Sequence, residues 1–209
     1  MIRVLFVVDG PKDQFIVPPI ARNAVNIGPE NPFHIWKDLR VNKGDQALRG
    51  YESKLSFAMR LAVDSGLHGV VATVDTDKDK RGDKLRRLRN GRVEQRNNGI
   101  TTPAALGEAT PHAEAWLIDD STAVRSVLRV PEDRELPVVT AVLSPKEALD
   151  ELIAVSSVSH LPQEELLQTI AAAIDPKRCE KAKATGLRAF IKDLRDEYRA
   201  ARTGDDDAS

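Results

Sequence analysis

Three aspartates stand at alternate positions directly after an apolar run, in the segment VVATVDTDKDKRGDK at residues 70–84. If this backbone stays extended, Asp75, Asp77 and Asp79 point their side chains in the same direction. When carboxylates lie this close together, they do not all ionise readily unless a cation neutralises them. Mg²⁺ takes one or two carboxylates and completes its shell with water. The spacing suits a magnesium site, and the simpler alternative is a solvated turn balanced by the basic residues that follow.

Two familiar sites with similar composition do not fit this segment. A calcium loop of the EF-hand type needs Gly at its sixth position and Glu at its twelfth, but counting from Asp75 these positions hold Lys80 and Arg86. A phosphate-binding loop of the Walker type needs the pattern G-x-x-x-x-G-K-[ST], which the chain does not contain. ATP hydrolysis by this chain alone is therefore not expected.

A run of positive charge follows the aspartates. Residues 78–96 contain nine lysines and arginines against three acidic residues. Such an excess beside carboxylates suits a polyanion laid across a metal ion, with its phosphates held by basic side chains. A solvated helix face, or a surface for an acidic protein, is the alternative. The residues predicted to bind nucleic acid are Lys78, Lys80, Arg81, Lys84, Arg86, Arg87 and Arg89.

The elements that must position these residues follow from hydrophobic patterns. The runs IRVLFVVDG (2–10) and GVVATVD (69–75) are typical of strands buried on both faces, and TPAALGEAT (102–110) is a weaker third candidate. Residues 45–66 have one apolar helical face with Gly66 as C-cap, and Asp83 is placed to N-cap a basic helix through about residue 94. Alternating strands and helices predict a doubly wound, mainly parallel α/β sheet.

The remaining patterns after residue 113 are helical. Amphipathic segments occur at 144–155, 161–174 and 186–198, with Pro145 at a helix start and Ser121 as an N-cap. Near the N-terminus, Pro18 and Pro19 predict a kink or late start in a helix over 13–25. We expect an α/β domain over 1–130, a helical C-terminal section over 131–200 packed on it, and a disordered tail over 201–209.

Composition limits the function classes. With 209 residues and a net charge of −1, the chain suits a globular protein and not one that coats nucleic acid or membrane indiscriminately. Cys179 is the only cysteine, so an intrachain disulfide and a cysteine-based zinc site are excluded. The first apolar run is too short for a signal peptide and no later segment approaches a membrane span, so we expect a cytoplasmic protein without a membrane partner.

Asp9 and Asp75 both end apolar strand candidates, and ligands of open α/β sheets bind beyond the carboxyl ends of the strands. If the two strands are neighbours, Asp9, Asp75 and Asp77 converge. Here the sequence resembles the Toprim domain of topoisomerases, primases and related nucleases, in which an acidic residue followed by Gly ends the first strand and D-x-D ends a later one. The resemblance narrows to a Toprim-like family of bacterial defence loci, related to the nucleases encoded beside ABC-type ATPases. It rests on the ordered blocks FVVDGPKDQFIVPPIARNAV, DTDKD, PHAEAWLIDD, SPKEALDEL and ATGLRAF.

The resemblance implies a set of site residues. Asp75 and Asp77 would hold Mg²⁺ or Mn²⁺, Asp9 would position or help to deprotonate the attacking water, and Glu114 would be a fourth carboxylate at the metal. Toprim domains normally have Glu at the first acidic position, so the shorter Asp9 departs from the pattern and puts its acid–base role in question. Glu114 could alternatively pair with an arginine or cap a turn.

From this we expect a metal-dependent phosphodiesterase acting on DNA or RNA, in antiphage defence and with an ABC-type ATPase partner. The alternative is a catalytically impaired Toprim-like module that binds nucleic acid or regulates the ATPase, which the Asp9 departure favours. A phosphatase acting on small phosphoesters is a third class, but it would not need the basic helix.

Overall fold

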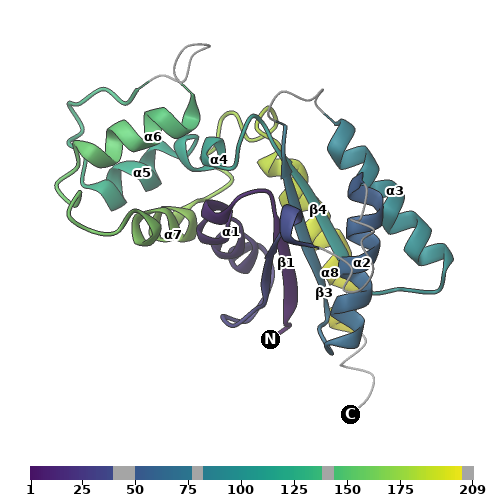
Figure 1. Cartoon of the computed structure of the whole chain (residues 1–209). Coiled ribbons are helices and arrows are strands. Elements are labelled where there is room, and N and C mark those ends of the chain that lie inside the picture. Colours follow the sequence, from purple (N-terminus) through teal and green to yellow (C-terminus); the bar gives the residue numbers. More distant parts are fainter. Residues whose placement is uncertain (40–49, 77–81, 138–143, 204–209) are drawn as a thin grey trace.

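A four-stranded parallel sheet organises the chain (Figure 1). The computed structural model describes residues 1–39, 50–76, 82–137 and 144–203. The strands lie in the order β2-β1-β3-β4, and their bounds are β1 Val4–Val8, β2 Phe33–Ile35, β3 Gly69–Asp75 and β4 Ala104–Ala109. The α/β class and parallel pairing agree with the sequence, and TPAALGEAT forms β4.

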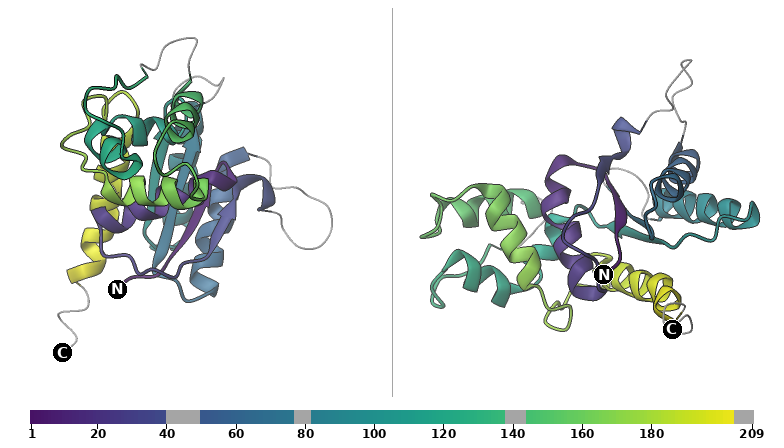
Figure 2. Two further views of the ribbon diagram at one scale, coloured as in Figure 1. Left: turned by 90° about the vertical axis from the view of Figure 1, so that its left-hand side faces the viewer. Right: turned by 90° about the horizontal axis from the view of Figure 1, so that it is seen from below.

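Helices cover both faces of the sheet (Figure 2). Leu5 and Val7 of β1 point to a core shared with α2 (Gly50–Asp64) and α3 (Asp83–Asn97). The alternate residues of β1 point to the opposite core, which includes α1 (Val17–Ala24) and α8 (Leu187–Thr203). Because both faces are buried, β1 and β3 are apolar along almost their whole length. The structure is therefore doubly wound.

The α1 segment starts late, as the two prolines predict. Residues Pro11–Phe15 form a short 3₁₀ helix, η1, and α1 begins at Val17 with Pro18 and Pro19 in its first turn. Proline is tolerated there because the first amides of a helix have no partner within the helix. A second 3₁₀ helix, η2 (Trp36–Asp38), follows β2. The strand β2 was not expected, since three residues are too few to show a pattern.

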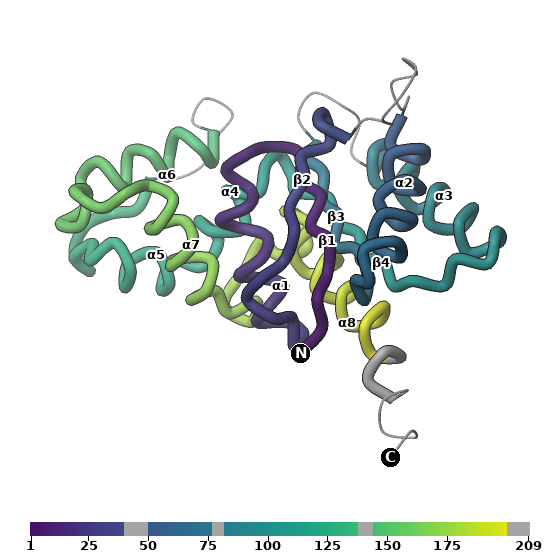
Figure 3. Tube along the Cα trace, turned by 60° about the horizontal axis from the view of Figure 1, so that its bottom comes forward, coloured from purple at the N-terminus to yellow at the C-terminus, as the bar shows by residue number. Residues whose placement is uncertain are grey.

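Four helices between β4 and α8 form a lobe beside the α1 face of the sheet (Figure 3). They are α4 (Glu114–Ile118), α5 (Ser121–Leu128), α6 (Pro145–Ala154) and α7 (Gln163–Ala173). Within the lobe, α5 packs against α7, while α8 lies on β4. The expected division at residue 130 thus places α5 and α7, which pack together, in different sections. It also places α8 in a different section from β4, on which it packs.

Several helix ends differ in detail from the sequence-based expectation. The N-cap of α5 is Asp120, whose side chain accepts a hydrogen bond from the Ala123 amide, and not Ser121. Gly82 is the N-cap of α3, so Asp83 is its first residue. Gly66 follows α2 with φ of +65°, as expected of a C-cap glycine. The α8 helix extends to Thr203, and residues 204–209 of the expected tail lie outside the described residues.

No helix in the described ranges is both long enough and apolar enough to cross a lipid bilayer. The longest, α8, carries charged side chains along one face.

Asp120 anchors the helical lobe to the segment that leads back to the sheet. Its side chain is fully buried and accepts hydrogen bonds from the Asp175 amide at 2.9 Å and from the Arg178 guanidinium at 2.7 Å. Burial alone would raise the pKa of Asp120, but these donors outweigh it and the pKa is lowered. The charged form of Asp120 is therefore the one that the fold stabilises.

Asp120→Asn should lower the free energy of unfolding by about 2–3 kcal/mol near neutral pH, since it weakens a hydrogen-bonded ion pair whose acidic member is buried. Because the folded-state pKa is lowered, the contribution of the carboxylate is present above the unfolded-state pKa and is lost as the pH falls through the folded value. The difference from wild type should shrink below about pH 4. Urea unfolding at several pH values measures this difference in the free energy of unfolding.

Asp196→Asn, at an exposed ion pair with Lys192, is the control and should change stability by less than about 0.5 kcal/mol. Equal effects of the two substitutions would contradict the assigned role of Asp120.

Candidate functional site

The sheet topology brings Asp9 and Asp75 together. Asp9 directly follows β1, Asp75 ends β3, and these strands are paired in parallel. The chain leaves β1 toward β2 on one side, whereas β3 and β4 lie on the other, which makes this a topological switch point. The Asp75 amide donates a hydrogen bond to Oδ2 of Asp9 over 2.7 Å. The expected convergence therefore holds for these two residues.

Lys84 lies between the two strand ends. Its Nζ donates to the carbonyl oxygen of Asp75 at 2.7 Å and is 3.5 Å from Oδ2 of Asp9. The residue is 9% exposed, so this ammonium group is largely withdrawn from water. A buried cation needs compensating charge and acceptors, which Asp9 and the Asp75 carbonyl supply. The sequence placed Lys84 among phosphate-binding residues, whereas the structure places it inside the carboxylate site.

Tyr51 of α2 covers the same carboxylate from the other side. Its hydroxyl donates to Oδ1 of Asp9 at 3.4 Å, and Nζ of Lys84 is 5.9 Å from its ring centroid. Burial, and then the negative charge of Asp9, raise the pKa of Tyr51 to about 12. Tyr51 therefore stays a neutral hydrogen-bond donor at physiological pH.

His112 adds an imidazole to the site. Its Nδ1 is 3.3 Å from Oδ2 of Asp75. The loop that carries His112 is joined to the end of β3, because the Thr76 amide donates to the carbonyls of Ala109 at 2.9 Å and Pro111 at 3.1 Å. His112 stands two residues before Glu114 in the sequence, and the structure shows it beside Asp75.

Glu114 begins α4 and is 7% exposed. Within the described residues its carboxylate makes no hydrogen bond to Asp9, Asp75 or His112. Asp77 lies outside the described residues, as do Asp79, Lys78, Lys80 and Arg81. In the part of the chain that is described, no three His, Cys, Asp or Glu side chains form a group able to hold a metal ion.

The chemical groups at this site are still of the kind that binds a hard metal cation. Asp9 and Asp75 offer carboxylate oxygens, which Mg²⁺ and Mn²⁺ prefer. Mg²⁺ uses only one or two carboxylates and fills its shell with water, so Asp9 and Asp75 together supply the number of carboxylates that it needs. The direct contact between the two residues runs from the Asp75 amide to the Asp9 carboxylate. The residues therefore fit such an ion, with Lys84 as an internal cation beside it.

Glu108 is a site residue that the sequence analysis missed. It lies in β4, is 7% exposed, and accepts the Gly82 amide with both carboxylate oxygens, at 3.0 and 2.9 Å. Gly82 has φ of +87° and is the N-cap of α3. Glu108 thereby fixes the start of the helix that carries Lys84. A charged residue within the apolar segment AALGEA is the signal that could have identified it.

The described part of the basic run divides into three groups. Arg86, Arg87 and Arg89 are exposed on α3, and Arg86 pairs only with Asp83 of the same helix at 3.2 Å within the described ranges. Farther along, two arginines of α3 bind α8 instead: Arg92 lies 2.8 Å from Asp193, and Arg96 contacts Glu197. The third group is Lys84 in the site. The exposed arginines at the start of α3 are thus the described part of the run that is open to a polyanion.

The sequence matches no model of a known protein family, and the searches of curated proteins and of solved structures also found no match. The Toprim resemblance accordingly stays a prediction drawn from the motifs, and the geometry of the site has to support any function by itself.

Lys84→Met should lower the free energy of unfolding by about 1–3 kcal/mol, because it removes an ion pair with Asp9 and a hydrogen bond to Asp75 while keeping a similar volume. Chemical denaturation measures the change. Arg89→Met, on the exposed face of the same helix, is the control and should shift stability by less than about 0.5 kcal/mol. If Lys84→Met were as stable as the control, Lys84 would not be an integral part of the site.

Proposed function

We propose that the chain is a metal-dependent phosphodiesterase with a Toprim-like fold, acting on DNA or RNA. The observation that carries this proposal is the convergence of Asp9 and Asp75 at the switch point of the sheet, at the start of the basic helix α3. A role in bacterial antiphage defence with an ABC-type ATPase partner belongs to the same proposal and rests on the motif resemblance alone.

Each residue has a role in this mechanism. Asp75 and Asp77, supported by Asp9 and Glu114, would hold Mg²⁺ or Mn²⁺, whose chemistry there is activation of water and neutralisation of phosphate charge. His112 is oriented through Nδ1 by the Asp75 carboxylate, an arrangement suited to moving a proton to or from a substrate oxygen. Lys84 reduces the repulsion between the carboxylates. Arg86, Arg87 and Arg89 hold flanking phosphates.

The second candidate is a catalytically impaired module that binds nucleic acid or regulates a partner ATPase. The position of Lys84 favours it, because an ammonium group beside Asp9 and the Asp75 carbonyl already provides positive charge at the strand ends. The replacement of the usual Glu by Asp9 points the same way.

A cleavage assay distinguishes the two candidate functions. The protein is incubated with a labelled plasmid or a total RNA pool in the presence of Mg²⁺ or Mn²⁺. The nuclease proposal expects metal-dependent cleavage that Asp75→Asn abolishes, either by the chain alone or after addition of any ATPase encoded beside it. Binding of either nucleic acid without cleavage in every arm would favour the module. A third arm with a small phosphoester detects phosphatase activity.

Metal binding can be tested without a substrate. An ion that binds only the folded state increases the free energy of unfolding, by about 2.7 kcal/mol at a hundredfold excess over the dissociation constant, and so raises the melting temperature. Mg²⁺ or Mn²⁺ should therefore stabilise the wild type, and Asp75→Asn should lose most of that gain. Thermal melting with and without millimolar Mg²⁺, with Ca²⁺ for comparison, is the measurement. Identical responses of the two proteins would remove the metal site and the nuclease proposal with it.

Phosphate contacts by the exposed arginines predict a change in salt dependence. The triple variant Arg86→Ala, Arg87→Ala, Arg89→Ala should bind nucleic acid more weakly, and its log-log salt slope should be shallower by roughly one unit per lost contact. Fluorescence anisotropy over a salt series measures both quantities.

The matched control replaces three exposed arginines of α8, which packs on the opposite face of the sheet from α3. They are Arg188, Arg195 and Arg199. This control should retain the wild-type slope. A slope that is unchanged in the α3 variant would assign its arginines to solvent or to a protein partner.

A further inference from the structure

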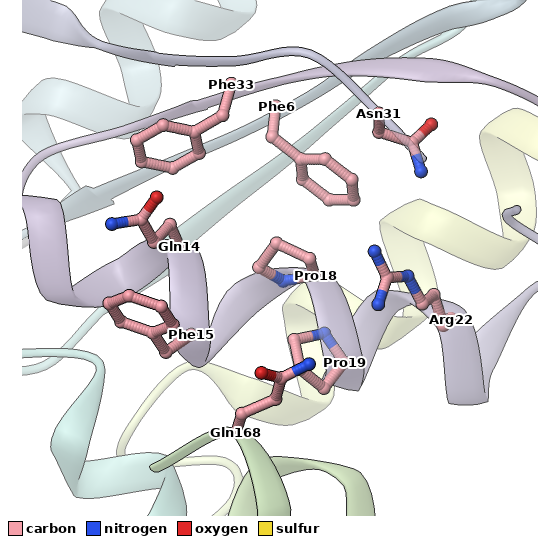
Figure 4. A pocket seen from close by; sticks show the side chains of 9 residues that line it. All are labelled: Phe6, Gln14, Phe15, Pro18, Pro19, Arg22, Asn31, Phe33 and Gln168. Atoms are coloured by element: carbon pink, nitrogen blue, oxygen red, sulfur yellow. The ribbon is translucent and has the colours of Figure 1, made fainter. Parts of the chain in front are cut away.

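A pocket of about 200 Å³ opens on the α1 face of the sheet, and its lining includes neither Asp9 nor Asp75 (Figure 4). It is enclosed by β1 and β2 above, by η1 and α1 below, and by α7 at the rim. None of the residues that line it has a role in the proposed mechanism. The pocket is therefore a separate feature that needs its own explanation.

Aromatic rings and proline rings form part of the pocket wall. Phe6 of β1 is 1% exposed, and Pro18 and Pro19 of α1 are buried. Phe33 and Phe15 are partly exposed and complete one side, with the Gln14 amide between them in Figure 4. Aromatic rings and proline rings present flat surfaces that suit a planar ring.

One end of the pocket carries a positive charge. The guanidinium of Arg22 points from α1 toward Phe6 and Pro18 (Figure 4). It donates to the Pro29 carbonyl, but its Nε is buried without a hydrogen-bond partner, and it forms no ion pair with any residue in the described ranges. Burial also lowers the pKa of Arg22. Arg22 is only partly buried and lines the pocket, and a hydrogen bond from a guanidinium to an anion is charge-assisted, so this end of the pocket is suited to an anion.

The polar groups of the rim divide into fixed and available ones. Asn31 is fixed, because its Oδ1 accepts from the Val4 amide at 2.7 Å and its Nδ2 donates to the Gly28 carbonyl at 2.6 Å. Within the described structure, the side-chain amides of Gln14 and Gln168 make no hydrogen bond. They are available to hold a ligand's polar groups. A few convergent polar groups around an apolar pocket are typical of small-molecule sites.

We propose that this pocket binds a small molecule made of one planar ring with a carboxylate or phosphate group. The ring lies among Phe6, Phe33 and Pro18, and the anion accepts hydrogen bonds from Arg22. The volume limits the ligand to this size, since cavities of roughly 150 Å³ hold a single benzene ring. This inference does not depend on the proposed nuclease activity.

Isothermal titration and ¹⁵N–¹H NMR of the full chain test the proposal with benzoate and phenyl phosphate as probes. At least one of them should bind saturably below about 10 mM, which is within the range expected of a ligand with so few atoms. Amide shifts should concentrate in residues 14–22 and 31–35. Benzyl alcohol, which has the ring but no charge, should bind at least tenfold more weakly, as should acetate and inorganic phosphate, which have the charge but no ring.

Two variants separate the contributions of ring and charge. Arg22→Gln should weaken binding of the anionic probe at least tenfold and leave the affinity for benzyl alcohol unchanged. Phe33→Ala should weaken the binding of both compounds. Arg195→Gln on α8 is the control and should bind like wild type. The proposal is overturned if neither anionic probe binds, if their shifts map elsewhere, or if Arg22→Gln binds the anionic probe as wild type does. Comparison of benzoate with phenyl phosphate identifies the preferred anion.

Discussion

The hydrogen bond from the Asp75 amide to the Asp9 carboxylate joins the ends of the two central strands. It forms only because β1 and β3 are parallel neighbours, so that their carboxyl ends meet at the same edge. Around this contact the structure gathers one residue from each nearby segment: Lys84 from α3, Tyr51 from α2 and His112 from the loop after β4. A shift in the register of β1 and β3 would therefore separate Asp9 from Asp75.

Lys84 gives the site its electrostatic character. Two carboxylates at one sheet edge repel each other, and an ammonium group next to Asp9 reduces that repulsion in the protein itself. Glu108 supports this arrangement from a distance, because its bond to the Gly82 amide fixes the start of the helix on which Lys84 stands. Lys84 is thus held by other residues of the protein, unlike Arg86, Arg87 and Arg89, which are exposed.

The sequence predicted the sheet class, β1, β3, α2 and the convergence of Asp9 with Asp75, since each rests on a local apolar pattern or on strand ends. It did not reveal β2, because three residues carry too little periodicity. Nor did it assign Arg92 and Arg96 to Asp193 and Glu197, since those ion pairs join positions about a hundred residues apart. The role of Lys84 was hidden for a related reason: in a run of nine basic residues, only tertiary packing shows that Lys84 is buried.

The packing of α8 also has a consequence for how the chain acquires its fold during synthesis. A Cβ on Gly107 would lie 2.6 Å from the ring of Phe190, and the Tyr198 hydroxyl donates to the Val70 carbonyl, so α8 sits directly against β4 and β3. Yet β4 ends at Ala109 and α8 begins at Leu187. Ribosomes add about 5 to 20 residues per second, so the completed strands emerge several seconds before the helix that covers them. During that interval the apolar surface of β3 and β4 is exposed to chaperones and to other nascent chains.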